Sequence, residues 1–307
     1  AGYREAVPWW WRMLNEPMLA DLVALCRDWR PDLVVWEATT FSGGVAAEAC
    51  GAAHVRFVWS LDLFSRMRGW FLRRRAEAGA VEDPLGEWLG ERGGRFGVEF
   101  SESLVRGRMT VDQTPLSLRV GAGEGVDYPV EYVPVRYVPF NGRAVVPGWL
   151  RRPPVGGGRR VAVSLGTSTV EWYGGYSVAV GEVVEALGGV DAEVVVTLPG
   201  GGGLGRVPGN VRVVEYVPLH ALVPWCSAVV CQGGPGTVFT SLAWGVPMVV
   251  VPRAGLFDAP LLAERVAGVG AGVALDAGSA SGGVVVEALG RVLDEGSFAV
   301  AAGGVAG

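Results

Sequence analysis

A glycine-rich loop, QGGPGT at Gln232–Thr237, is the segment whose residue types best suit chemistry. It follows the short apolar run Ala228–Cys231 and precedes Val238–Trp244, where apolar residues recur at helical spacing. A glycine turn that leaves a strand and opens a helix directs backbone N–H groups and the positive end of the helix dipole at one point, which suits a phosphate. Thr237 could cap that helix or donate its hydroxyl to the same anion. The glycines could equally serve only to turn the chain.

Two further segments follow predicted strands and could reach a ligand on this loop. SLGTS at Ser164–Ser168 ends the strand Val161–Leu165, and Phe257 and Asp258 follow the buried β-branched strand Val246–Val251. Ligands of open parallel sheets bind where the strands end. The Asp258 carboxylate could accept a hydrogen bond from a ligand hydroxyl, or it could simply be the N-cap of the next helix. The SLGTS segment could likewise be an ordinary turn.

The elements that must position these segments alternate between strand and helix. A helix at Met18–Trp29 precedes the strand Asp32–Trp36, the helix Thr40–Gly51 and the strand His54–Trp59, and a similar order resumes at Val161. This rhythm predicts α/β units with parallel sheets. Prolines and glycines at 141–158 predict a linker between a first domain at 1–140 and a second at 159–307.

Composition narrows the class of protein. Half of the 307 residues are hydrophobic and the formal net charge is −5, so the sequence predicts a soluble protein without a basic face for nucleic acid. No apolar run reaches the roughly 18 residues of a membrane-spanning helix, and no signal peptide is visible. The four cysteines show no metal-binding spacing and are expected to be small buried hydrophobes, which fits a cytoplasmic location.

Taken together, these segments resemble the nucleotide-diphospho-sugar site of GT-B glycosyltransferases, in the branch that adds deoxysugars to macrolides and anthracyclines. The resemblance covers nearly the whole chain in the expected order. Its further segments are Met18–Trp59, Tyr132–Leu150 with YVPVRYVPFNGRAVVPGWL, Val161–Ser168 with VAVSLGTS, and Tyr216–Pro224 with YVPLHALVP. It implies an α/β fold of two Rossmann-like domains with a cleft between them.

The resemblance also implies an enzyme, a metal-independent and inverting glycosyltransferase. Its donor would be a thymidine-diphospho-deoxysugar and its acceptor a hydroxyl of a hydrophobic polyketide or macrolide-type aglycone, with no cofactor. The donor diphosphate would be bound by Gln232, Gly233, Gly234, Gly236, Thr237, Ser164, Gly166 and Thr167, the nucleobase by Val217, Pro218 and Leu219, and the donor sugar by Asp258 and Phe257. We see no Asp-x-Asp pair placed for a metal.

One departure from the family concerns the leaving group. The family usually has a histidine pair before the glycine loop, and its second member contacts the diphosphate; here the pair is Cys231-Gln232. The Gln232 amide can donate an N–H, but it cannot carry a proton or a positive charge. More of the stabilisation would then come from backbone N–H groups, unless Gln232 is only a polar residue that closes a turn.

The general base is the less defined part of the site. In the family it is commonly a histidine of an N-terminal loop, supported by an acid at the end of a later strand. This chain begins with a helix, so about a hundred residues that carry that loop are expected to be missing. Glu37, at the end of the Leu33–Trp36 run, stands at or beside the acid's place, and we expect it to be the partner of the base or the base itself. It could also be a solvated strand-end carboxylate. The two histidines, His54 and His220, are expected to be structural.

The resemblance leaves several expectations about partners and some alternatives open. Aromatic residues of the first half could line a pocket for a large aglycone, although most are expected in the core; they are Trp9, Trp10, Trp11, Trp59, Phe64, Trp70, Phe71 and Trp88. An auxiliary protein resembling a cytochrome P450 could bind the long helix Leu61–Gly79, or a second copy could. The alternative functions are a catalytically degenerate partner subunit and a nucleotide-sugar epimerase of the same fold.

Overall fold

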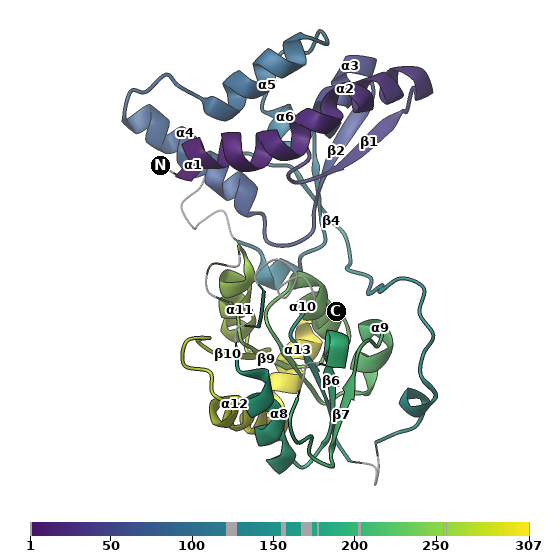
Figure 1. Cartoon of the computed structure of the whole chain (residues 1–307). Coiled ribbons are helices and arrows are strands. Elements are labelled where there is room, and N and C mark those ends of the chain that lie inside the picture. The colour runs from purple at the N-terminus through teal and green to yellow at the C-terminus, as the bar shows by residue number, and fades with distance from the viewer. Residues whose placement is uncertain are drawn as a thin grey trace. The chain divides into compact units, whose positions relative to one another are not determined.

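The computed structural model describes residues 2–120, 128–154, 158–166, 174–176, 178–201, 204–253, 255 and 257–306 (Figure 1). The chain divides into two compact units. Unit 1 comprises Ala1–Thr114 and Arg119–Arg136, and unit 2 comprises Pro115–Leu118 and Tyr137–Gly307. None of the described helices is long and apolar enough to cross a membrane.

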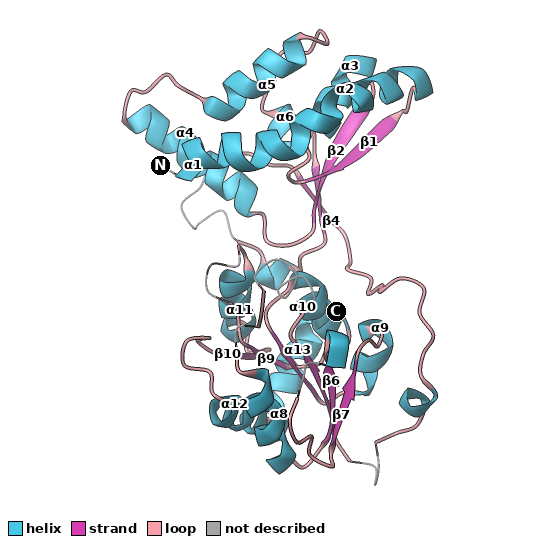
Figure 2. Cartoon of the chain, viewed as in Figure 1, coloured by secondary structure: helices cyan, strands magenta, loops and turns pink. Residues whose placement is uncertain are grey.

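Unit 1 is a parallel sheet with helices packed against it (Figure 2). Its elements are α1 (Gly2–Ala6), the π-helical η1 (Val7–Trp11), α2 (Arg12–Trp29), β1 (Leu33–Glu37), α3 (Phe41–Cys50), β2 (Ala53–Val58), α4 (Leu63–Glu77), α5 (Pro84–Gly94), α6 (Ser103–Arg106), β3 (Thr110–Asp112) and β4 (Tyr132–Pro134). The strand order is β1-β2-β3-β4, and all pairs are parallel. The α/β class expected from the alternation is therefore confirmed for this unit.

The core of unit 1 is aromatic and forms between β1 and its helices. Trp11, Trp36, Phe41 and Trp88 are buried in one cluster, with edge-on ring contacts between Trp11 and Phe41 and between Phe41 and Trp88. A Cβ on Gly43 would overlap the side chain of Trp36, so this glycine lets α3 lie directly on β1. Dense packing of large rings of this kind dominates the energetics of a core.

A buried histidine joins three elements of unit 1. The Trp36 indole N–H donates to His54 Nδ1 at 3.1 Å, which leaves Nε2 to donate to Glu48 at 3.2 Å. Burial lowers the pKa of His54 and outweighs the hydrogen bond to Glu48, which raises it. The expectation that His54 is structural is confirmed, because its ring connects β1, β2 and α3.

The outer edge of this sheet is apolar. β1 pairs with β2 and stands at the end of the strand order of the described residues. Its side chains Leu33 and Val35 are 50% and 58% exposed.

Unit 2 holds a second parallel sheet between helices (Figure 2). Its elements are η2 (Leu116–Leu118), η3 (Gly148–Arg151), β5 (Arg160–Ser164), α8 (Val180–Ala186), η5 (Leu187–Gly189), β6 (Glu193–Thr197), η6 (Pro199–Gly201), β7 (Val211–Val214), α9 (Leu219–Leu222), η7 (Val223–Trp225), β8 (Ala228–Cys231), α10 (Pro235–Ala243), β9 (Met248–Val250), α11 (Ala259–Gly268), β10 (Gly272–Ala274), α12 (Gly282–Asp294) and α13 (Gly296–Ala306). The central strands β5, β8 and β9 are buried on both faces, as parallel strands are.

The strand order of unit 2 defines where a ligand would bind. The order is β10-β9-β8-β5-β6-β7, so the chain builds outward from β5 to β7 and then returns to the other side of β5 with β8. The sheet therefore has a switch point between β5 and β8. In open α/β sheets, the crevice at the carboxyl ends of the strands beside such a point is the usual ligand site.

The segment at 137–154 packs on unit 2. Leu150 is buried, and Trp149 lies under the Arg212 guanidinium at 4.9 Å from the ring centroid. The buried Arg160 donates to the Arg152 carbonyl at 3.2 Å. Much of the stretch for which the sequence predicts a hinging linker is thus held by side chains of β5 and β7.

Several local expectations need correction. The first long helix begins at Arg12 rather than Met18, and α10 begins at Pro235, because proline is favoured in the first turn of a helix. The Gly/Ala-rich segment near residue 300, for which the sequence predicts no helix, forms α13. Two glycines explain this, since Gly245 approaches Gly303 of α13 so closely that a Cβ on Gly245 would lie 3.1 Å from its Cα.

Candidate functional site

Two of the predicted segments meet at the switch point of unit 2. Ser164, the last residue of β5, pairs in register with Cys231, the last residue of β8. Just beyond them, the side chain of Gln232 lies against Gly166, where a Cβ would overlap Gln232 Nε2. Gly166 also has a φ of 75°, which only glycine adopts readily. Thr167 lies outside the described residues.

Gln232 is more enclosed than the sequence suggests. It is only 8% exposed, so its amide is set between the two strand ends rather than projecting from a loop. The thiol of its neighbour Cys231 is fully buried, and burial raises the pKa of that thiol to about 11. In place of the family's histidine pair, the switch point therefore holds two neutral, buried side chains, Cys231 and Gln232.

The helix α10 presents its N-terminus at the same place. Gly234 occupies the N-cap, and its carbonyl accepts from the N–H groups of Thr237 and Val238, at 3.0 Å each. Thr237 is therefore not the cap that the sequence allowed, because Pro235 opens the helix two residues earlier. Pro235 has no N–H, and Gly236 lies in the first turn, where helix N–H groups have no acceptor within the helix. The anion-binding geometry thus rests on Gly236 and on the dipole of the helix.

The third segment, around Asp258, joins this group through Gly233. Gly233 has a φ of 86°, and a Cβ there would lie 3.2 Å from the Ala259 carbonyl oxygen, at the start of α11. Asp258 is buried at the N-cap position of α11, yet its side chain makes no capping hydrogen bond to the described residues of that helix. Phe257 is half exposed and has a positive φ of 24°, an unusual conformation for a side chain of its size.

The predicted nucleobase segment lies at the end of β7 and enters α9. Val217 and Pro218 are buried, and Leu219 is half-buried. The side-chain oxygen of Asn141 accepts from the His220 backbone N–H at 2.8 Å and lies 3.0 Å from His220 Nδ1. His220 thus fixes a turn, as expected of a structural histidine, whereas no sequence pattern singles out Asn141 as its partner.

Tyr137, which precedes the segment 141–158, contacts α10. The hydroxyl of Tyr137 lies 3.3 Å from the carbonyl oxygen of Gly236 and 3.3 Å from Thr240 Oγ1. Its ring makes an edge-on contact with Phe239, with centroids 5.5 Å apart. No sequence signal marks this residue, because it lies 99 positions from Gly236 in the chain.

In unit 1, Glu37 is held at the carboxyl end of β1 by several donors. Its carboxylate accepts from the Thr39 backbone N–H at 2.9 Å and hydroxyl at 2.8 Å, and from the Thr40 hydroxyl at 2.7 Å. The Trp59 indole N–H, beyond the end of the neighbouring strand, donates at 3.2 Å. Glu37 is therefore an oriented, half-buried carboxylate and not a freely solvated one.

The aromatic residues expected around an aglycone are divided. Trp11, Phe64 and Trp88 are core residues, whereas Trp9, Trp10 and Trp70 are exposed. Phe71 stacks on Tyr3 with ring centroids 4.3 Å apart. Of the eight, Trp59 is the one whose polar edge reaches the candidate carboxylate Glu37.

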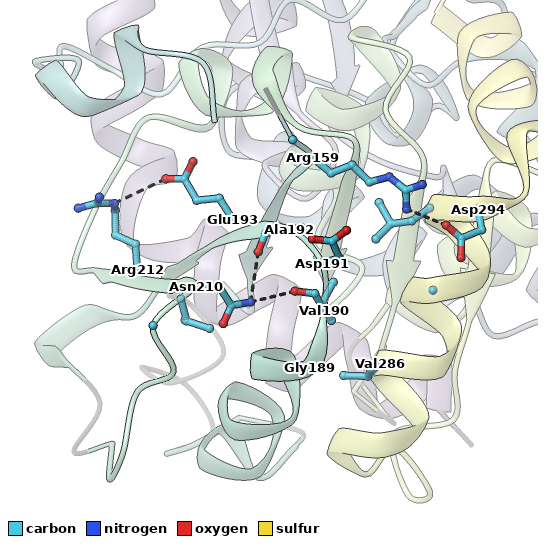
Figure 3. Close-up of a pocket in the computed structure, with 15 residues that line it drawn as sticks. Arg159, Gly189, Val190, Asp191, Ala192, Glu193, Asn210, Arg212, Val286 and Asp294 are labelled. Carbon is cyan, nitrogen blue, oxygen red and sulfur yellow. Dashed lines mark hydrogen bonds and ion pairs between the residues drawn. The ribbon is translucent and has the colours of Figure 1, made fainter. Parts of the chain in front are cut away.

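A cavity of about 1060 Å³ lies at the opposite edge of the unit 2 sheet, where β5, β6 and β7 begin (Figure 3). Arg159 pairs with Asp294 at 2.7 Å, and Arg212 lies 3.8 Å from Glu193. Asn210 donates to three backbone carbonyls. Arg159 and Arg212 are thus paired with carboxylates of the cavity, and the residues that line it include none of the predicted site. Among the described residues, no group of three or more His, Cys, Asp or Glu side chains could hold a metal ion.

Comparison with known families agrees with this architecture. The model of the N-terminal domain of erythromycin biosynthesis protein CIII-like proteins matches residues 2–166, and the model of their C-terminal domain matches residues 181–307. The chain is similar to the crystal structure of the glycosyltransferase VinC in complex with DTDP, with a TM-score of 0.86 and 38% identity over 99% of this chain and 73% of that one.

Curated relatives are also similar over most of the chain. Tylactone mycaminosyltransferase of Streptomyces fradiae is 47% identical over 86% of this chain and 59% of its own length. Aclacinomycin-T 2-deoxy-L-fucose transferase of Streptomyces galilaeus is 44% identical over 92% of this chain and 63% of its own length. The chain thus spans about three fifths of the length of these two relatives.

Two parallel α/β units, with a glycine loop at the switch point of the second, define the GT-B class of fold, and the class expected from the sequence is confirmed. Within that class, the chain belongs to the erythromycin biosynthesis protein CIII-like family.

Proposed function

We propose that this chain forms the donor-binding part and a portion of the acceptor-binding part of a glycosyltransferase. The enzyme transfers a deoxysugar from a thymidine-diphospho-sugar to a hydroxyl of a polyketide-type aglycone, with inversion and without a metal. The observation that carries the proposal is the meeting of Gly166, Gln232 and the α10 N-terminus at the switch point. Family membership and the relatives that carry sugar-transferase names support the class of donor and acceptor.

The donor site supplies what a diphosphate leaving group needs. Negative charge develops on the diphosphate as the glycosidic bond to the sugar breaks, and preorganised N–H donors stabilise it without having to reorganise. We assign this role to the backbone at Gly233, Gly234 and Gly236, to the amide of Gln232 and the hydroxyl of Thr237, and to the β5 loop from Ser164 through Gly166 to Thr167. Since Gln232 is neutral and buried, the helix dipole carries more of the stabilisation than it would beside a histidine.

The nucleobase and the donor sugar are assigned to residues that lie, like the diphosphate site, at the carboxyl ends of the unit 2 strands. We assign the nucleobase to the main chain of Val217, Pro218 and Leu219, at the end of β7. The donor sugar is assigned to Asp258 and Phe257, next to the glycine loop through the Gly233–Ala259 contact. Asp258 would accept a hydrogen bond from a sugar hydroxyl.

On the acceptor side we assign Glu37 a positioning role. The bonds from Thr39, Thr40 and Trp59 occupy its two oxygens and fix its direction, as expected of a carboxylate that orients the group that takes the acceptor's proton. Three further parts of the proposal rest on the family resemblance. The acceptor is an apolar aglycone, and the location is cytoplasmic. The helix α4 binds either an auxiliary protein resembling a cytochrome P450 or a second copy of the chain.

The proposal is tested by calorimetric titration of the protein with thymidine diphosphate and uridine diphosphate in EDTA, followed by the same titrations in magnesium. We expect thymidine diphosphate to bind in EDTA, with little change on adding magnesium. Turnover is then measured with TDP-mycaminose and tylactone, by the mass of the product. Glu37→Gln, which keeps the shape of the side chain, should lower turnover by about 10²- to 10⁴-fold and leave thymidine diphosphate affinity unchanged.

Two results would contradict the proposal. If neither nucleotide bound, the donor site would be wrong. If thymidine diphosphate bound but the full-length protein gave no product with this pair or with other TDP-deoxysugar and aglycone pairs, even with an auxiliary protein, a partner subunit without its own catalysis would be the better description.

A further inference from the structure

The short stretch Tyr137–Asn141, YVPFN, contacts two separate parts of unit 2. Tyr137 at one end contacts α10, and Asn141 at the other contacts the turn between β7 and α9. The side chains between them do not anchor the stretch, since Val138 and Phe140 are 67% and 74% exposed. The stretch is therefore held at its two ends.

Tyr137 acts on the first turn of α10. Its hydroxyl is within reach of the Gly236 carbonyl oxygen and of Thr240, and its ring rests on Phe239. The Gly236 carbonyl belongs to the same planar peptide unit as the Thr237 N–H. That N–H already donates to the Gly234 carbonyl at 3.0 Å, so the hydrogen bond from Tyr137 adds a second constraint on the same peptide and holds the first turn at the anion-binding end of the helix.

Asn141 acts on both ends of the Val217–Leu219 segment. Its side-chain oxygen accepts from the His220 N–H, and its own carbonyl accepts from the Tyr216 hydroxyl at 2.8 Å. The three residues between Tyr216 and His220 are thereby tied to Asn141 at both ends. Their main-chain groups can recognise a planar base only if their conformation persists.

We propose that Tyr137 and Asn141 are positioning residues that hold the diphosphate and nucleobase subsites at a fixed spacing. The inference rests on the proposed donor site and adds two residues to it that do not touch the donor themselves. A proline at position 139, which limits the backbone between the two anchors, makes the spacing stiffer than a flexible stretch would.

The test compares three ligands of increasing length, thymidine, thymidine monophosphate and thymidine diphosphate, by calorimetry. Tyr137→Phe keeps the ring and removes only the hydroxyl, so affinity for thymidine diphosphate should fall by about 3- to 10-fold while affinity for thymidine is unchanged. Asn141→Leu should weaken all three ligands by a similar factor. Asn141→Asp should recover most of that loss, because its carboxylate can still accept from the His220 N–H.

Controls separate positioning from folding. Val145→Ala alters a side chain of the same segment that is 89% exposed, and it should bind all three ligands like the unsubstituted protein. Where turnover is measured, Tyr137→Phe should raise the KM for the donor more than it lowers kcat. Thermal midpoints are recorded for each variant.

Unchanged affinities in both Tyr137→Phe and Asn141→Leu, with thymidine diphosphate still bound by the unsubstituted protein, would overturn this inference alone. So would equal losses for all three ligands in Tyr137→Phe. Failure of the unsubstituted protein to bind thymidine diphosphate would instead overturn the donor site and the inference with it.

Discussion

At the scale of single residues, Gly166 leaves no room for a Cβ beside the Gln232 amide. Gly166→Ala adds a Cβ that overlaps Gln232 Nε2, at a φ of 75°. The left-handed backbone alone costs about 1–2 kcal/mol. We expect the free energy of unfolding of unit 2 to fall by more than this, and affinity for thymidine diphosphate to fall by at least about 10-fold, measured by urea unfolding and calorimetry.

A matched control isolates the overlap from the backbone strain. Gly200 has a φ of 70°, and nothing lies within 4 Å of its would-be Cβ, so Gly200→Ala carries the strain alone. Adding Gln232→Ala to Gly166→Ala should restore part of the stability, because the overlapping amide is gone. Equal losses in Gly166→Ala and Gly200→Ala would mean that the Gln232 contact is unimportant.

Residue types predict the glycines of the site, but they do not predict which side chains are buried beside those glycines or pack against them. Gly166 and Gly233 could be selected because turns with positive φ require glycine, and both lie at strand ends that the sequence places on one edge. The burial of Gln232 could not be foreseen, because it depends on how closely β5 and β8 end. Tyr137 and Asn141 were equally inaccessible, since their partners are distant in sequence.

At the scale of elements, the ring of His54 links the stability of β1, β2 and α3 to pH. Its pKa is lowered in the folded protein by burial, so the unfolded chain binds more protons as the pH falls below about 6.5. The stabilisation is complete above that pH and is lost on acidification. We expect the free energy of unfolding of unit 1 to decrease between pH 7 and pH 5, followed by the fluorescence of its buried tryptophans in urea.

Two variants check the origin of this slope. His54→Gln should flatten it, because the titrating ring is removed. Glu48→Gln should steepen it, because the Glu48 carboxylate is the partner that raises the pKa of His54. A slope that persists unchanged in His54→Gln would assign the pH dependence to other groups.

Elements with clear patterns were predicted well, and those without were missed. β8 has the predicted bounds, because it is an apolar run that turn residues bound. The helix α13 was missed because glycine and alanine give it no amphipathic pattern, and its formation depends on packing against α10. The three-residue β4 was missed because proline and neighbouring turns obscure it, and its pairing with β3 defines it.

At the scale of the whole molecule, the two cores are separate, so a ligand of unit 2 should stabilise that unit selectively. A ligand present at 100 times its Kd adds about 2.7 kcal/mol to the unit that binds it. We expect thymidine diphosphate to slow amide hydrogen exchange in β5, β8 and α10, with little change in β1, β2 and α3, as measured by mass spectrometry of peptides. Uridine, at the same concentration, serves as the control. Equal protection of both sheets would contradict this prediction.

The side of β1 on which no described strand pairs has a consequence for how the chain behaves in concentrated solution. A strand at the end of a sheet offers a row of backbone donors and acceptors, and on β1 these accompany the exposed side chains Leu33 and Val35. Such a border accepts an additional extended segment from any source, which completes the hydrogen-bond ladder and covers the apolar side chains. The identity of the segment that pairs with β1 decides the outcome. A single defined segment adds one strand to the sheet, whereas pairing between many copies of the chain nucleates aggregation.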